Sequence, residues 1–323
     1  MQSLVDLLWV VGPRVAKITL FIAIGVFLAN LAVAFGAVRK IAALSRPLTH
    51  PANLPEEVGT AILTTTASTT AGYGMLAEFR ESGMLDDRAT LVAVTINTFF
   101  GFAQHIFTFY APVLIPILGL EVGLMYVGTR ALIALAITLV GIAAGAFLLS
   151  SHNVNHEATP EDVEAPGHEA TSTREKLEDA GQNTASKIRD IVPRLAIIYT
   201  LVVFLTTRYD IAAATAFADP LVAVVGLPIE AVPVIAVLTL DTTNGALVLA
   251  PLIENGTFTP RAAVATMLVG SIVSFAVTTF KRSIPFQYGI WGAEFGSKVI
   301  AVNTGLKLVF ISLAVGILLA PIW

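Results

Sequence analysis

The chain alternates between long apolar runs and short polar breaks, with few charges inside the runs. The clearest runs begin at Ile18 (ITLFIAIGVFLANLAVAFGAV), Ala131 (ALIALAITLVGIAAGAFLL) and Leu308 (LVFISLAVGILLAPIW). An α-helix needs about 20 mostly apolar residues to cross the roughly 30 Å hydrocarbon core of a bilayer. Only 13% of the residues are charged, about half the share found in soluble domains. The pattern therefore predicts an all-α polytopic membrane protein.

One stretch of the chain departs from this pattern. Residues 150–190 are polar and acidic, and the sequence NHEATPEDVEAPGHEATSTRE within them has too few apolar residues to form a core. We interpret 150–190 as an acidic soluble linker between two membrane repeats, 15–149 and 191–323, with an interfacial N-terminal segment at 1–14. The linker residues His152, His156 and His168 match no common metal-ligand spacing, so we predict no metal site.

The two membrane halves are related by an internal repeat. A shift of 173 residues aligns 54–112 with 227–285 without a gap, and 17 of the 59 aligned positions are identical. Thr, Gly, Pro, Glu and Arg supply many of these identities, which a shared apolar bias does not explain. Each half is expected to hold a first span (15–38 or 191–207), a threonine- and glycine-rich segment, a second span from Arg88 or Arg261, and a third span (122–149 or 299–320).

The threonine- and glycine-rich segment, Pro55 to Phe79 in the first half, either crosses the membrane once or returns as a re-entrant hairpin. With hairpins each half crosses three times, so the halves are inverted. That arrangement places 13 Lys and Arg residues on the linker's side and four on the other, as the positive-inside rule requires for a cytoplasmic linker. We therefore expect two inverted repeats, each with three spanning helices and a re-entrant hairpin. The protein would lie in the cell (plasma) membrane with both termini outside.

The hairpins are the first candidates for a binding site. Non-helical backbone at membrane depth is tolerated where it lines a cavity or is buried in protein, and half-helix ends in inverted-repeat transporters bind solutes near the midplane. Close packing of small residues is the alternative explanation. Recurrence at matched positions favours a substrate site, formed by Thr69, Thr70, Gly72, Thr242, Thr243, Asn244 and Gly245.

Charged and polar residues within the spans extend this site. Arg130 and Lys307 lie at similar depths in the third spans, where each is either functional or a side chain that reaches the membrane surface. Lys281 and Arg282 face the cavity if the helix is only broken there, and anchor at the cytoplasm if the span ends. The other expected substrate-binding residues are Asn97, Gln104, His105, Gln287, Asn303 and Thr304.

Three carboxylates are candidate coupling-ion sites: Glu57, Glu230 and Asp241. Asp241 stands where the first repeat has Ser68, as expected if one hairpin alone binds a cation, and a structural pair with a lysine is the alternative. His105 is a candidate proton-linked group or a hydrogen-bond donor in helix packing. The coupling ion would be Na⁺ or H⁺, and the sequence does not choose.

A family resemblance rests on two motifs. Each half runs from LPxE (Leu54–Glu57, Leu227–Glu230) to TTxG (Thr69–Gly72, Thr242–Gly245) and then to a proline-broken span. This layout resembles the nucleoside-recognition (Gate) domain in the membrane core of concentrative nucleoside transporters and of ferrous-iron uptake proteins. The resemblance implies a gated transporter with its solute between hairpin tips and broken spans. The chain lacks cysteine and a GxxxxGK[ST] phosphate loop, which disfavours ferrous iron.

These observations predict a secondary transporter of a small polar or anionic metabolite, either nucleoside-like or bearing a phosphate or carboxylate. An inorganic-ion channel and a non-transporting Gate-domain assembly subunit are the alternatives. No nucleophile–base pair or HExxH motif points to an enzyme, and no cofactor is expected. The expected partners are the lipid bilayer, a small-molecule solute and the coupling ion, with no nucleic acid. The repeat neither requires nor forbids a homo-oligomer.

Overall fold

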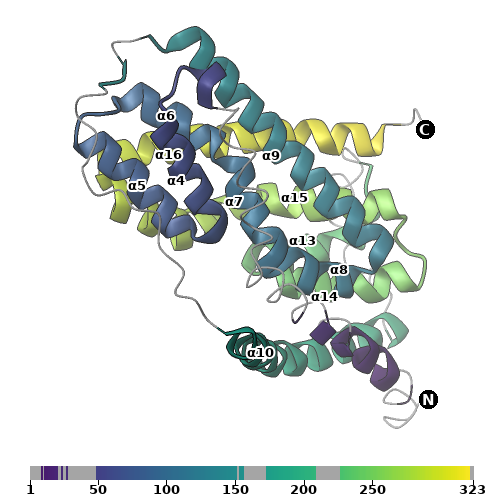
Figure 1. The fold of residues 1–323 in the computed structure, drawn as a ribbon. Helices are drawn as coiled ribbons and strands as arrows, with labels where there is room; N and C mark the ends of the chain where they lie inside the picture. The colour runs from purple at the N-terminus through teal and green to yellow at the C-terminus, as the bar shows by residue number, and fades with distance from the viewer. Residues whose placement is uncertain are drawn as a thin grey trace.

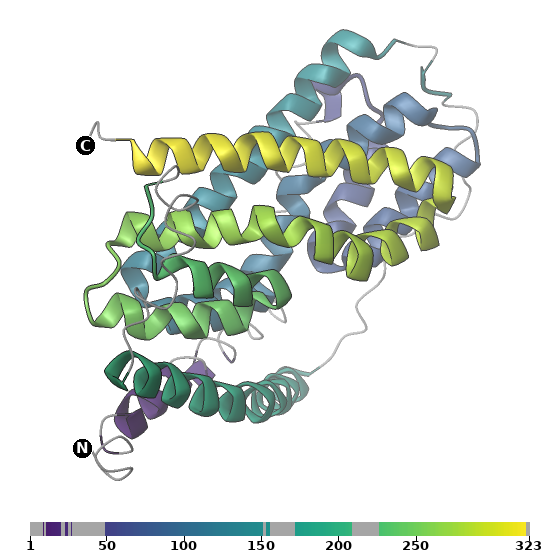
Figure 2. The ribbon, with the colours of Figure 1, turned by 180° about the vertical axis from the view of Figure 1, so that it is seen from behind.

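The computed structural model describes residues 9, 11–20, 23–24, 27, 49–150, 153–155, 172–208 and 226–320. These residues are helical almost throughout and contain no β-sheet. The helices stack side by side in one elongated bundle, and α10 (Thr173–Arg208) lies across one side of it (Figures 1 and 2). Most of the first expected span, 15–38, lies outside the described residues.

Three helical segments in the described part of the chain are long and apolar enough to cross a membrane. The first, Asp87–Leu118, comprises α6 (Asp87–Ile96), α7 (Thr98–His105), the π-helical η2 (Ile106–Leu114) and α8 (Ile115–Leu118). The other two are α9 (Leu120–Leu148) and α16 (Ile284–Leu319). The chain is therefore an all-helical membrane protein, as the apolar runs predict.

Each threonine- and glycine-rich segment forms two short helices joined at one extended residue. In the first half α4 (Glu56–Ala67) and α5 (Thr69–Glu81) meet at Ser68, where φ is −146°. In the second half α13 (Ala231–Leu240) and α14 (Thr242–Glu254) meet at Asp241, where φ is −155°. Both residues are preferred N-caps, and each side chain accepts a hydrogen bond from the backbone N–H three residues on, at 3.3 Å from Ala71 and 2.9 Å from Asn244.

Two glycines allow the paired helices to pack closely. A Cβ atom at Gly72 would collide with Thr65 Oγ1 and lie 2.6 Å from the carbonyl oxygen of Ala61. A Cβ atom at Gly245 would collide with the Leu238 side chain. Because these contacts join α5 to α4 and α14 to α13, each segment is a helical hairpin. The two glycines that the sequence placed in the binding site therefore have a packing role.

The local backbone repeats at the same spacing beyond the aligned sequence. Gly83 and Gly119 have φ of 80° and 82°, and residues 173 positions later, Gly256 and Gly292, have φ of 82° and 72°. The π-helices η2 and η6 (Thr279–Ser283) also begin 173 residues apart, as do α6 and α15 (Pro260–Thr278). The positive φ at Gly292 divides α16 into two helices, which correspond to α8 and α9.

Each hairpin core contains helix residues from the other half. Leu118, Val122 and Tyr126 of the first half are buried in the core that includes α13, α14 and α15. Their equivalents 173 residues on, Trp291, Phe295 and Val299, are buried in the core that includes α4, α5 and α6. Neither core is completed by its own half alone, so the two halves are interlocked.

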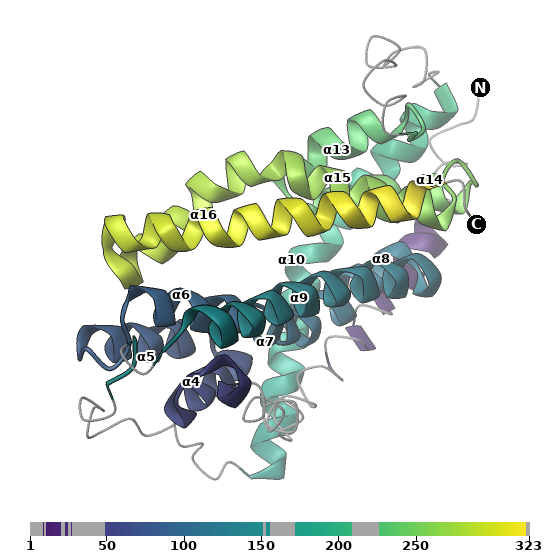
Figure 3. The ribbon, with the colours of Figure 1, turned by 90° about the horizontal axis from the view of Figure 1, so that it is seen from above.

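The long helices α9 and α16 lie side by side in opposite directions (Figure 3). Arg130 of α9 lines a cavity with Lys307 of α16, whereas Ala144, further along α9, lines a groove with Ala301. Residue numbers thus rise along one helix as they fall along the other.

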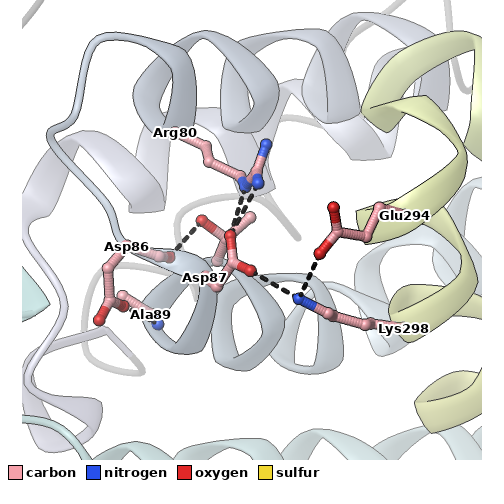
Figure 4. A network of polar contacts seen from close by, with 7 residues as sticks. Arg80, Asp86, Asp87, Ala89, Glu294 and Lys298 are labelled. Atoms are coloured by element: carbon pink, nitrogen blue, oxygen red, sulfur yellow. Dashed lines mark hydrogen bonds and ion pairs between the residues drawn. The ribbon is translucent and has the colours of Figure 1, made fainter.

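A polar network joins the halves at one end of the bundle (Figure 4). The Asp87 carboxylate pairs with Arg80 at 2.8 Å and with Lys298 of α16 at 3.0 Å. Its neighbour Asp86 caps α6 by accepting from Ala89 N at 2.8 Å. The Arg80 guanidinium also lies 4.2 Å from the centre of the Phe295 ring, so α5, α6 and α16 are held together by charge and by packing.

The expected soluble linker is in part helical, which corrects the sequence interpretation. The helix α10 begins at Thr173 and passes the expected boundary at 190–191 without a break. A capping box starts it: Ser172 Oγ accepts from Glu175 N at 3.2 Å, and the Glu175 carboxylate accepts from Ser172 N at 2.7 Å. Overall composition gave no sign of this local signal, which lies in the letters STRE.

Candidate functional site

A cavity of about 210 Å³ lies between α5, α7, η2, α9 and α16. It brings together residues from the first hairpin, the broken second span and both third spans. Six of the residues expected from the sequence line it: Thr69, Asn97, His105, Arg130, Asn303 and Lys307. No acidic side chain is among its lining residues.

Two cationic side chains face this cavity from the paired helices. Arg130 and Lys307 are half-buried, and neither forms an ion pair within the described part of the chain. Arg130 donates a 3.4 Å hydrogen bond from Nη2 to the Tyr110 hydroxyl, and its guanidinium lies 6.0 Å from the centre of the Tyr126 ring. These neutral groups orient Arg130 without neutralising it, so the cavity has an excess of positive charge.

Asn97 presents an unpaired acceptor to the same cavity. Its Nδ2 donates to Thr65 Oγ1 at 3.0 Å, and the Thr65 hydroxyl donates to the Ala61 carbonyl at 3.0 Å. Because the one hydroxyl proton of Thr65 is used, Thr65 has to accept from the amide, which fixes the orientation of Asn97. Asn97 is 1% exposed, and its Oδ1 receives no hydrogen bond from the described residues.

The helix break beside Asn97 is held by Thr138 of α9. The Thr138 hydroxyl donates to the Ile96 carbonyl at 2.9 Å and accepts from Phe99 N at 3.2 Å. Backbone groups freed by a helix break inside a membrane need such partners. Thr138 therefore stabilises the irregular backbone that points Asn97 at the cavity.

The second half has an apolar pair where the first has Thr65 and Asn97. The residues 173 positions later are Leu238 and Gly270, and a Cβ atom at Gly270 would lie 2.6 Å from Leu238 Cδ1. A large and a very small residue thus replace two polar residues of intermediate size. The exchange removes the acceptor and keeps the packing, so the polar site is built in one half only.

Other expected substrate-binding residues lie away from the cavity lining. Gly72 and Gly245 pack within their hairpins, Thr70 and Arg282 are exposed, and the Lys281 side chain lies outside what the structure describes. Gln104 bonds His105 Nδ1 at 2.9 Å, and Gln287 accepts from the Trp291 indole at 2.8 Å. The remaining expected residues that do not line it are Thr242, Thr243, Asn244 and Thr304.

The three expected coupling-ion carboxylates also lie outside this cavity. Glu57 is in the first turn of α4, Glu230 precedes α13, and Asp241 caps α14. None is brought to Arg130 or Lys307 as a counter-ion in the described structure. No cluster of three His, Asp or Glu side chains suited to a metal occurs among the residues searched.

Sequence reasoning missed Tyr73, Thr98 and Tyr110, which add polar atoms to the lining, and Thr65 behind it. Tyr110 lies in the proline-broken segment, where its hydroxyl binds Arg130. For Thr65 the aligned repeats held a usable signal. Positions 65 and 97 are polar in the first half, and positions 238 and 270 are apolar or glycine in the second.

Comparison with known proteins extends over nearly the whole chain. The chain is 24% identical over 305 residues to the uncharacterized protein MJ0871 of Methanocaldococcus jannaschii, covering 94% of this chain and 93% of that protein. The uncharacterized protein MJ0880 of the same organism is 24% identical over 311 residues, covering 95% and 98%. No family model matches the chain, and no solved structure matches it significantly.

Proposed function

We propose that the chain is a membrane transporter for a small anion, bound in the cavity between α5, α7, α9 and α16. The observation that carries this proposal is that Arg130 and Lys307 line one cavity without a carboxylate partner. Ionisable residues inside membrane spans are costly and mark solute or ion pathways. An anionic solute would supply the missing negative charge.

The size of the cavity favours a small solute. Its volume of about 210 Å³ is below the roughly 300–1,000 Å³ of pockets that enclose drug-sized ligands. A phosphate or a short carboxylate suits this volume better than a nucleoside. The proposal therefore keeps the transporter layout implied by the Gate-domain resemblance and narrows the solute to the anionic class.

The fold supports an inverted-repeat transporter with re-entrant hairpins. At about 1.5 Å per residue the hairpin helices are about 15–20 Å long, which is short of the about 30 Å of hydrocarbon. The opposite directions of α9 and α16 and the interlocked cores fit two halves related by an axis in the membrane plane. In this arrangement the linker is cytoplasmic, both termini are outside, and the site lies near mid-membrane of the plasma membrane.

The asymmetry between the halves favours a carrier over a channel. A selective channel needs rings of like ligands, whereas Thr65 and Asn97 have no polar counterpart at Leu238 and Gly270. One polar site in a pseudo-symmetric frame suits a single solute that is bound and released. Coupling to Na⁺ or H⁺ remains part of the proposal, and His105 is the titratable side chain at the cavity.

Anion binding to the purified full-length protein tests this function. We expect phosphate or a short carboxylate to bind, and R130Q or K307Q to weaken binding about 10- to 100-fold, because each removes a charge-assisted contact. R261Q is the matched control, since Arg261 is exposed and outside the cavity lining. Unchanged affinity in both R130Q and K307Q would contradict the proposal.

A further inference from the structure

We infer that the anion bound in this cavity also carries a neutral hydrogen-bond donor, so that the site selects oxyanions that retain a hydroxyl group. Protonated phosphate and short hydroxycarboxylates have this chemistry, whereas sulfate and plain carboxylates lack it. The inference rests on the proposed anion site and specifies which anions that site accepts.

The fixed orientation of Asn97 is the first observation. The chain of donors from Asn97 Nδ2 to Thr65 Oγ1 and from Thr65 to the Ala61 carbonyl runs in one direction. Flipping the amide would place two acceptors, Asn97 Oδ1 and Thr65 Oγ1, against each other. The buried Oδ1 therefore stays directed at the cavity as an acceptor, and a ligand without a donor leaves it unpaired.

A second acceptor comes from α16. The Oδ1 atom of Asn303 is buried and receives no hydrogen bond from the described part of the chain. Asn303 lies one helical turn before Lys307, so both side chains are on the same face of α16, and both line the cavity. The site thus combines two cations with two unpaired amide acceptors.

The charge of the cavity decides which kind of donor fits. An ammonium group would satisfy the acceptors, but Arg130 and Lys307 would repel it and no lining carboxylate would offset that repulsion. A neutral hydroxyl satisfies the acceptors without this cost. Phosphate retains at least one proton near neutral pH and sulfate retains none, although both are tetrahedral oxyanions.

The second half of the chain supplies the test variant. The double substitution T65L/N97G reproduces the Leu238–Gly270 pair that packs at the equivalent place. It removes the acceptor of Asn97 and leaves Arg130 and Lys307 in place. T266V is the control for loss of a buried polar group, because Thr266 is fully buried in α15 and outside the cavity lining.

Equilibrium binding to the full-length protein is measured with two matched pairs of anions, phosphate against sulfate and lactate against propionate. We expect the wild type and T266V to prefer the hydroxyl-bearing member of at least one pair by about tenfold or more. The pair that is discriminated identifies phosphate or a hydroxycarboxylate as the source. In T65L/N97G the preference should fall toward unity while anion binding persists.

Three results would overturn the inference. If all four anions bind and neither pair is discriminated, the anion site stands and the donor requirement is wrong. If T65L/N97G binds anions with an unchanged preference, Asn97 does not select the ligand. If no anion binds to the wild type, the proposed anion transport fails together with the inference.

Discussion

Arg130 and Asn303 occupy the same position in the two halves of the chain, 173 residues apart, and both line one cavity. The same holds for Ala134 and Lys307. Repeat-equivalent positions on α9 and α16 therefore face each other with different side chains. The repeat supplies the frame, and differences between its copies supply the chemistry of the site.

The interlocked cores predict a strong effect at Phe295. Phe295 is 2% exposed, contacts Trp291 edge-on with ring centres 5.4 Å apart, and belongs to the core of the first hairpin. F295A should lower stability by about 3–5 kcal/mol, as large-to-small changes in packed cores do. Thermal unfolding in detergent measures this. F147A at an 87% exposed position is the control, and an equal loss in both variants would contradict interlocking.

The close approach of the hairpin arms predicts opposite results for two glycines of α5. G72A should lower the unfolding temperature markedly, because the new methyl group would collide with Thr65. G74A should leave it unchanged or raise it, because nothing lies within 4 Å of that position and alanine favours a helix by about 1 kcal/mol over glycine. If thermal unfolding finds G72A as stable as G74A, the hairpin packing is wrong.

The network around Asp87 predicts a modest, salt-dependent contribution. D87N removes the partner of both Arg80 and Lys298. These side chains are partly exposed, so we expect a loss of about 1 kcal/mol or less at low salt and a smaller one at high salt. Thermal unfolding at two salt concentrations measures the effect, with E78Q on the exposed side of α5 as the control. A large loss that salt does not change would contradict this assignment.

The start of α10 should depend on pH. Hydrogen bonds from Ser172 lower the pKa of Glu175 below its usual value. A lowered pKa means that the capping contact is complete above the unfolded value of about 4.3 and is lost as pH falls through the folded one. Hydrogen exchange at 173–176, corrected for the intrinsic rate, should show less protection at acid pH. E175Q should already show reduced protection at neutral pH, and pH-independent protection in the wild type would count against the capping box.

Some of this structure could be predicted from residues alone. Gly83, Gly119 and their equivalents recur at one spacing because each takes a positive φ that other residues avoid. Such positions mark the layout of both halves. The capping box at Ser172 was equally readable but local, and a composition argument over the whole linker passed over it.

Other features required the fold. Arg130 and Lys307 could be chosen as charges within apolar runs, but the absence of a carboxylate beside them is a property of three-dimensional packing. The exchange of Thr65 and Asn97 for Leu238 and Gly270 joins positions on different helices, so its meaning depends on their contact. The completion of each core by the opposite half is likewise invisible in a linear pattern.

Occupancy of the cavity by an anion is the central claim, and the cysteine-free chain allows a direct measurement. T69C places a single thiol at the cavity lining, and T70C places one at an exposed neighbour outside it. We predict that phosphate or a short carboxylate slows labelling of T69C by a thiol reagent in a saturable manner and leaves T70C unaffected. No protection of T69C by any of these anions, in protein that is folded and labels readily, would contradict the account.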